Sequence, residues 1–203
     1  MKRFRNAIIS FTGFRQDESA RSGFEDGYFR EIAPLQNSNT ITFAPRTWTT
    51  NIEHLADQLK RQGVERVALV SYSHGQAAAT AFSRYAYEIG IDVDLWLACD
   101  PVYRPTWLPR ATWTQPFAFR AIFKTGKIKV PQWIMRTVYI RQERDLPRGH
   151  TLVPTAGHQV VELAGVYHTY GHCEIDEAPE WWAIVKEELH RWANPPKAIE
   201  IPE

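Results

Sequence analysis

The chain has 203 residues, which is enough to bury a substantial core in one domain without disulfides and too few to expect a second independent domain. Its 24 Lys and Arg against 23 Asp and Glu give a formal net charge of +1, so global charge favours neither a nucleic-acid nor a membrane partner. The two cysteines fit a reducing compartment, no run approaches roughly 18 apolar residues, and the apolar run 7–11 lacks a small-residue cleavage site. We therefore expect a single domain over 1–203, in the cytoplasm.

Apolar segments typical of strands and amphipathic segments typical of helices alternate along the first half of the chain. Strands are predicted at 7–11, 40–44, 64–72 and 92–99. Helices are predicted at 52–61, capped by Asn51 and followed by Gly63, and from Gly75 to about Ile89. Further strands at 137–141 and 159–163 and a helix at 178–192 complete the pattern. This alternation predicts an α/β three-layer sandwich, with a mostly parallel central sheet flanked by helices.

The composition changes abruptly between Asp100 and Glu143, where no acidic residue occurs and cations alternate with aromatic residues and prolines. We interpret residues 101–136 as an inserted cap or lid. Such a lid suits an amphiphilic or anionic ligand, a membrane surface or an acidic partner. Nucleic acid is disfavoured, although cations interleaved with aromatic side chains could also track phosphates and stack bases. The plainer alternative is that the aromatic side chains pack the insert onto the domain and the cations face solvent.

The central motif is the segment Ser-Tyr-Ser-His-Gly at 71–75, which ends a valine-rich run and opens a helix-like segment rich in small residues. This pattern predicts strand, sharp turn and helix. Such a turn can hold Ser73 on a strained backbone with its hydroxyl available as a nucleophile. The alternative is a serine in an ordinary strand-to-helix turn.

A serine hydroxyl needs a base to take its proton, and a histidine base needs a carboxylate to fix its tautomer. Asp100 ends the strand after the one that carries Ser73, and functional residues collect at the carboxyl ends of parallel strands. Asp145, or with less support Glu143, competes for the role of the acid. His172 precedes the last helix and is our choice of base, with His168 in the same loop as the rival.

These features resemble the α/β-hydrolase superfamily. Its nucleophile elbow reads Gly-x-Ser-x-Gly, and here Ser71 stands in place of the first glycine. The order Ser73, Asp100, His172 is the order of the family, and His172 stands shortly before Ile175 and Asp176, as the base does in many members. The resemblance implies a small esterase or lipase-like serine hydrolase that cleaves carboxylic esters through an acyl-enzyme without a cofactor. It also implies an oxyanion hole made of the backbone N–H groups of Phe14 and His74.

Two other classes of function stay open. The first is a non-catalytic binding module on a hydrolase scaffold, in which the basic aromatic insert does the binding. The second is a metal hydrolase using His168 and His172 with Asp176 or His158, although Gly171 breaks the helix on which the four-residue histidine spacing would matter. Independently of these, Cys99 and Cys173 each neighbour a candidate triad residue, so a redox-sensitive pair is a further hypothesis.

Overall fold

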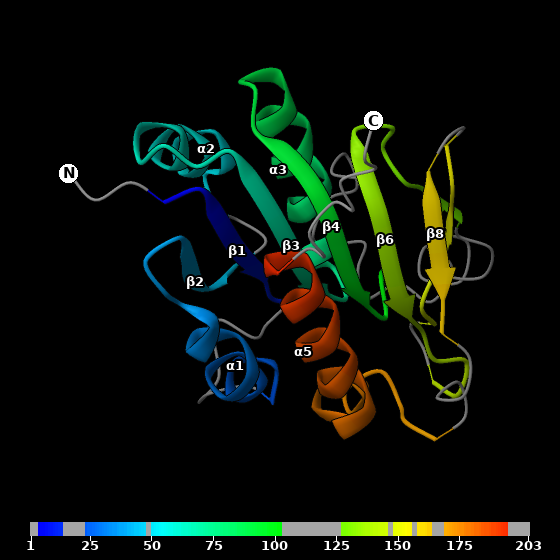
Figure 1. Cartoon of the computed structure of the whole chain (residues 1–203). Helices are drawn as coiled ribbons and strands as arrows, with labels where there is room; N and C mark the ends of the chain where they lie inside the picture. Colours follow the sequence, from blue (N-terminus) through cyan, green and yellow to red (C-terminus); the bar gives the residue numbers. More distant parts are fainter. Residues whose placement is uncertain are drawn as a thin grey trace, which may run out of the picture.

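The computed structural model describes residues 4–13, 23–47, 50–102, 127–145, 148–155, 158–163 and 169–194. Its centre is a six-stranded sheet in the order β2-β1-β3-β4-β6-β8, in which every neighbouring pair is parallel (Figure 1). The strands are β1 Asn6–Phe11, β2 Thr40–Arg46, β3 Arg66–Tyr72, β4 Asp92–Cys99, β6 Ile134–Ile140 and β8 Gln159–Glu162. The predicted α/β architecture with a parallel central sheet is confirmed.

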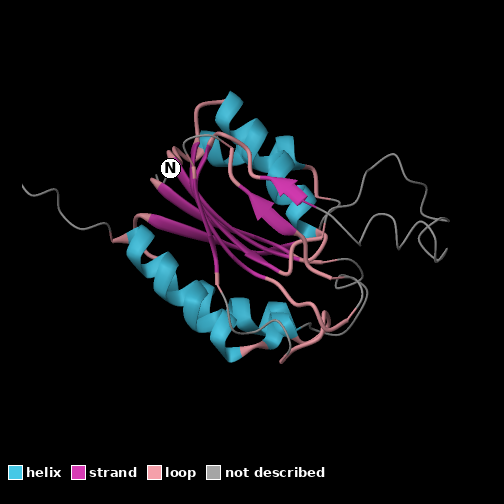
Figure 2. Cartoon of the chain, turned by 90° about the vertical axis from the view of Figure 1, so that its right-hand side faces the viewer, coloured by secondary structure: helices cyan, strands magenta, loops and turns pink. Residues whose placement is uncertain are grey.

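Helices cover both faces of this sheet, as Figure 2 shows in a view turned by 90°. They are α1 Gly23–Gly27, α2 Ile52–Arg61, α3 Gly75–Glu88 and α5 Pro179–Ala193. The chain continues from α1 through a π-helical turn at Tyr28–Ile32 and a 3-10 turn at Ala33–Leu35, and a second 3-10 turn at Ile175–Glu177 precedes α5. The predicted bounds of α2 agree with the structure, and the Asn51 side chain accepts a hydrogen bond from the His54 N–H at 3.0 Å, as an N-cap should.

The two faces of the sheet bury two separate cores. In β1 the side chains of Ala7 and Ile9 join the core under α2 and α3, whereas Ile8 joins the core under α1 and α5. This division follows from the alternation of side chains along a strand, and because both faces are covered, β1 is apolar throughout rather than alternately polar. The three layers predicted from the sequence are therefore present.

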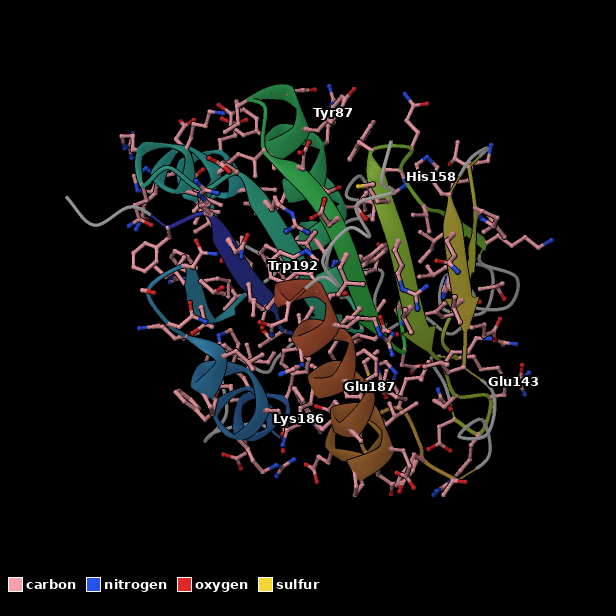
Figure 3. All side chains as sticks on the ribbon, in the orientation of Figure 1. Tyr87, Glu143, His158, Lys186, Glu187 and Trp192 are labelled. Carbon is pink, nitrogen blue, oxygen red and sulfur yellow. The ribbon has the colours of Figure 1, made fainter. Side chains whose placement is uncertain are left out.

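The last helix is fixed to the sheet through its aromatic residues. Trp181, Trp182 and Trp192 are buried, and the Nε1 of Trp192 donates to Asp94 Oδ2 at 3.1 Å at the C-terminal end of α5 (Figure 3). Because α5 follows the loop that carries His172, this packing sets the position of that loop relative to the sheet. In the part of the chain described, no helix combines the length and the apolar character needed to cross a membrane.

A small second sheet was not predicted. Strand β5 Lys127–Lys129 pairs in parallel with β7 Thr151–Val153. The expected insert at 101–136 lies mostly outside the described residues, which omit 103–126. Its final residues belong to sheets, because 127–129 form β5 and 134–136 begin β6.

Candidate active site

Ser73 occupies the sharp turn between β3 and α3, at the carboxyl end of the sheet. Its φ is +51°, a conformation that costs energy for any residue with a side chain. The Ser73 N–H donates to the Cys99 carbonyl at 2.9 Å, which ties the turn to the neighbouring strand β4. Gly75 opens α3 directly behind the turn, and a Cβ there would lie 2.4 Å from the Phe11 carbonyl oxygen. Helix α3 and strand β1 therefore pass close to each other at Gly75.

Asp100 follows the end of β4 and has a similarly unusual backbone, with φ of +43°. Its side chain is fully buried. Oδ1 accepts the Gln142 backbone N–H at 2.9 Å, and Oδ2 lies 3.3 Å from Gln142 Nε2. Gly149 packs against the same carboxylate so closely that a Cβ would lie 1.9 Å from Oδ1. The carboxylate is thus held in one orientation by donors and by backbone.

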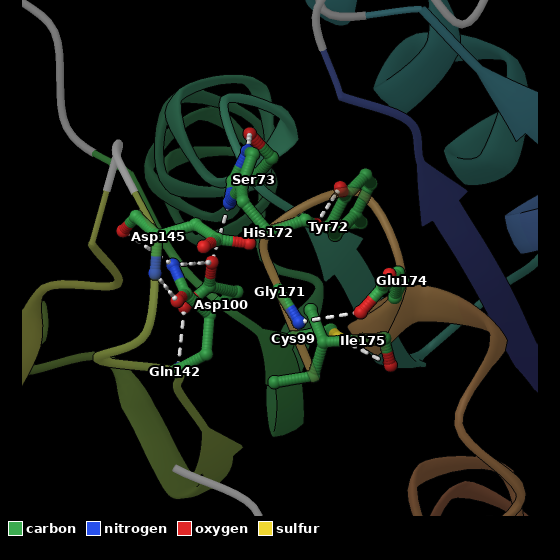
Figure 4. Close-up of polar contacts among 10 residues, drawn as sticks. All are labelled: Tyr72, Ser73, Cys99, Asp100, Gln142, Asp145, Gly171, His172, Glu174 and Ile175. Carbon is green, nitrogen blue, oxygen red and sulfur yellow. Dashed lines mark hydrogen bonds and ion pairs between the residues drawn. The ribbon is translucent and has the colours of Figure 1, made fainter. Parts of the chain in front are cut away.

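His172 joins the two strand ends (Figure 4). Its Nε2 lies 2.9 Å from Ser73 Oγ, and its Nδ1 is hydrogen-bonded to Asp100 Oδ2. A buried carboxylate accepts a hydrogen bond, so this contact favours the tautomer with the proton on Nδ1 and the Nε2 lone pair directed at the serine hydroxyl. Serine, imidazole and carboxylate therefore form one continuous hydrogen-bonded chain.

Tyr72 supports the imidazole from the side of β3. Its hydroxyl donates to the His172 backbone carbonyl, and its ring stacks on the imidazole with centroids 5.5 Å apart and planes at 27°. On its other side the same ring stacks on Phe24, with centroids 6.0 Å apart. Burial and the nearby Asp176 carboxylate raise the pKa of Tyr72, so the phenol stays protonated and remains a donor.

Tyr72 was not predicted as a site residue, although it lies between the two serines of the motif. Its proximity to His172 depends on a contact between residues 100 positions apart. Gln142 was missed for a similar reason, because its role depends on β6 lying beside β4 in the sheet. Neither residue type has a catalytic signature of its own, so no sequence signal was available for them.

The rival acids lie elsewhere. The Asp145 carboxylate is about half exposed and lies 3.7 Å from Arg144 Nε, while its backbone N–H donates to Gln142 Oε1 at 2.8 Å. Glu143 pairs with Arg141 at 2.5 Å. Among the candidates named from the sequence, Asp100 is the acid that contacts His172. The rival base His168 lies outside the described residues.

The two predicted oxyanion donors are described unequally. Phe14 lies outside the described residues, but Gly13 immediately before it approaches the nucleophile so closely that a Cβ there would lie 3.0 Å from Ser73 Cβ. His74 is the N-cap of α3 with helical dihedral angles, φ −69° and ψ −15°. Its backbone therefore stands at the positive end of the helix dipole, next to Ser73.

The metal-site alternative finds no support in the described segments, which contain no group of three or more His, Cys, Asp and Glu able to hold an ion. His158 contacts the Ile134 carbonyl at 2.6 Å, at the start of β6 and thus at the opposite end of the sheet from His172. Both cysteines are free thiols: Cys99 is buried, with its sulfur 3.6 Å from the Ile175 carbonyl, and Cys173 is exposed.

Comparison with known proteins adds little to this geometry. No protein-family model matches the sequence. No curated protein matches it either. Among solved structures, the crystal structure of Cfl2 wild-type from Burkholderia cenocepacia is similar, with 12% sequence identity and a TM-score of 0.41 over 94% of this chain and 88% of that one.

Proposed function

We propose that this protein is a serine hydrolase of the α/β-hydrolase superfamily that cleaves carboxylic esters. The observation that supports the proposal best is the hydrogen-bonded chain from Ser73 Oγ through both nitrogens of His172 to the buried Asp100. A nucleophile, a base and an orienting acid in this order are what acyl transfer at neutral pH requires. The positive φ of Ser73 and Asp100 adds support, because backbone strain concentrates at functional residues.

In the proposed reaction, Ser73 Oγ attacks the ester carbonyl as His172 Nε2 takes its proton. Asp100 stabilises the imidazolium through Nδ1–H. The C–O bond to the alcohol then breaks, the alcohol leaves with the proton from Nε2, and an acyl-enzyme remains on Ser73. Water, activated by the same imidazole, attacks the acyl carbonyl and releases the carboxylic acid.

The oxyanion of each tetrahedral intermediate needs donors on the side of the carbonyl away from His172. We assign this role to the backbone N–H groups of His74 and Phe14. The helix end at His74 and the close approach of Gly13 to Ser73 support this assignment. Backbone donors of this kind contribute strongly because they are fixed before charge develops on the oxygen.

The test is intact-mass labelling with a fluorophosphonate, together with hydrolysis of p-nitrophenyl esters of short and long acyl chains. We expect one label on the wild-type protein, none on Ser73→Ala, and one on Ser38→Ala, which changes an exposed serine outside the site. Ester turnover should disappear only in Ser73→Ala. Absence of both labelling and turnover in the wild type would refute the hydrolase and favour a binding module. In that case Ser73→Ala should leave binding unchanged.

A further inference from the structure

An open groove of about 960 Å³ follows α3 away from Ser73. Residues on successive turns of the helix line it, from Gln76 in the first turn to Glu88 in the last. The twelve steps along the helix from Gln76 to Glu88 correspond to a length of about 18 Å. The far part of the groove is largely apolar, with Tyr85 and Trp133 among its walls. It starts one residue after Gly75, immediately beside the nucleophile turn.

Gln76 lines this groove with an amide nitrogen that has no acceptor in the described part of the chain. The residue is 1% exposed, and its Oε1 accepts a hydrogen bond from Thr80 Oγ1 at 3.1 Å. Its Nε2 has no acceptor among the residues described. Turning the amide over would only exchange the two atoms and leave Oε1 without a donor. A buried amide atom without a partner is destabilising, so its presence on the wall of a groove points to a ligand.

The same groove carries a small excess of positive charge, with Lys127, Lys129 and Arg84 against Glu53 and Glu88. Lys127 and Lys129 are exposed and lie on one face of β5, since they are two residues apart. In the small sheet, Lys127 is the strand partner of Thr151. Thr151 follows two residues after Gly149, which packs against Asp100. The described chain provides no carboxylate within ion-pair distance of either lysine.

The other charged side chains of the groove offset these lysines in part, because Glu53 in the first turn of α2 also lines it. Arg84 and Glu88 pair with each other at 2.9 Å at the far end and neutralise one another. The groove thus combines two exposed lysines and the Gln76 amide nitrogen with the apolar side chains of Tyr85 and Trp133 farther along α3.

We propose that this groove binds the acyl arm of an ester that carries a negative group a few bonds from the scissile carbonyl, such as a carboxylate. The inference rests on the proposed esterase function and adds its substrate class. Lys127 and Lys129 attract the charge, Gln76 hydrogen-bonds an oxygen of the arm, and the apolar walls exclude water from the remainder. An amphiphilic or anionic ligand was expected from the insert, whereas the groove residues named here lie outside 103–126.

The kinetic test compares two esters of equal acyl length, p-nitrophenyl monoglutarate and p-nitrophenyl pentanoate. We expect wild-type kcat/KM to favour the glutarate ester. Lys127→Ala/Lys129→Ala should lower that preference about tenfold, the effect of two partly screened charges, without changing kcat/KM for pentanoate. Lys186→Ala on α5, on the opposite face of the sheet (Figure 3), is the control and should behave as wild type. An equal preference in the wild type and the double variant would overturn the proposal.

A binding experiment separates failure of the groove from failure of the esterase. The fluorescent anion 8-anilinonaphthalene-1-sulfonate combines a sulfonate with aromatic rings and needs no catalysis. We expect its Kd to rise about tenfold in Lys127→Ala/Lys129→Ala. The Kd should rise by a similar factor in Ala81→Glu, which adds a negative charge at an exposed groove position, but not in the control Ala81→Lys. If neither ester is hydrolysed and this pattern appears, the esterase is wrong and the groove stands. If Kd is the same in all variants, the groove proposal is wrong.

Gln76→Leu tests the amide separately. Leucine removes the unpartnered group at similar volume, so we expect Tm to stay equal or rise while kcat/KM for the glutarate ester falls several-fold. A lower Tm with unchanged kinetics would show that the amide serves packing, and would remove it from the proposal.

Discussion

Replacing Asp100 by asparagine tests the proposed chemistry at the group that the structure constrains most tightly. The carboxylate accepts from three donors: the Gln142 backbone N–H at 2.9 Å, Gln142 Nε2 at 3.3 Å and His172 Nδ1. An amide has only one oxygen. In one orientation its NH2 faces His172 and favours the tautomer with the proton on Nε2, which cannot take the proton of Ser73. In the other orientation its NH2 faces the buried backbone N–H of Gln142.

Both orientations remove the negative charge that stabilises the imidazolium. Loss of the carboxylate in a triad of this kind lowers kcat by about 10⁴, and at about 1.36 kcal/mol per tenfold this corresponds to about 5.4 kcal/mol of activation free energy. The second orientation would in addition lower the free energy of unfolding by about 1–3 kcal/mol, the usual cost of a buried donor without an acceptor. The unfolding free energy therefore reports which orientation the amide adopts.

The assay is kcat on a short p-nitrophenyl ester, with urea unfolding of the same preparations. Asp145→Asn is the matched control, because that carboxylate is half exposed and contacts Arg144 rather than His172. We expect its kcat to remain within a few-fold of wild type. A kcat for Asp100→Asn within tenfold of wild type, or a larger loss in Asp145→Asn, would refute the assignment of Asp100 as the acid.

Three further predictions concern residues around the nucleophile. Tyr72→Phe keeps the stacked ring but loses the hydrogen bond to the His172 carbonyl. Because the imidazole is then less well positioned, kcat should fall on the order of tenfold at similar KM, and an unchanged kcat would contradict this role. Gly75→Ala places a Cβ against the backbone of β1 and should lower the urea unfolding free energy by about 3 kcal/mol, whereas an unchanged urea midpoint would contradict the packing. Titration of the native protein with dithionitrobenzoate at pH 8 should detect Cys173 alone, and Cys99 should react only after unfolding. Cys173 should react more slowly than free cysteine, because partial burial and nearby carboxylates raise its pKa. Two rapidly reacting thiols would contradict the burial of Cys99.

Much of the fold could be predicted because each layer has a local signal. The apolar run before Ser73 and the small residues after it indicate a strand and a helix without knowledge of any contact. The alternation of such units makes a parallel sheet the simple solution, and the carboxyl ends of its strands are then brought together. That is why Ser73 and Asp100 could be expected near one another, and the structure brings His172 to both. Their catalytic role stays a prediction.

The elements that escaped prediction depend on contacts distant in sequence. The paired strands β5 and β7 have three residues each, too few for a recognisable period, and each is stable only beside the other. Tyr72 and Gln142 are recognised as parts of the site only when the loop before α5 and the end of β6 are placed. Likewise the unpartnered amide of Gln76 is invisible in a helix sequence, because it is defined by its surroundings.

Ser71 stands where the Gly-x-Ser-x-Gly motif that this segment resembles has glycine, and the structure shows a contact that requires its hydroxyl. Its hydroxyl accepts the Nε1–H of Trp96 at 2.9 Å from the neighbouring strand β4, and both residues are buried. Glycine, the usual residue at this place in the nucleophile elbow, would leave the indole N–H without an acceptor. We therefore expect Ser71→Gly to lower the free energy of unfolding by about 1.5–4 kcal/mol, of which about 1–3 come from the lost acceptor and about 0.5–1 from the flexibility of glycine in a strand.

A double-mutant cycle isolates the contact between Ser71 and Trp96. In a Trp96→Phe background the donor is absent, so Ser71→Ala should cost at least about 1 kcal/mol less in urea unfolding than it does in the wild type. The activity of the folded fraction should be unchanged by Ser71→Ala, since its side chain faces the core under α3 and Tyr72 faces the opposite core. Equal costs in the two backgrounds would mean that the serine is retained for its size alone. A positive coupling would instead explain why a polar residue stands at this position: the buried Trp96 of the neighbouring strand needs an acceptor there.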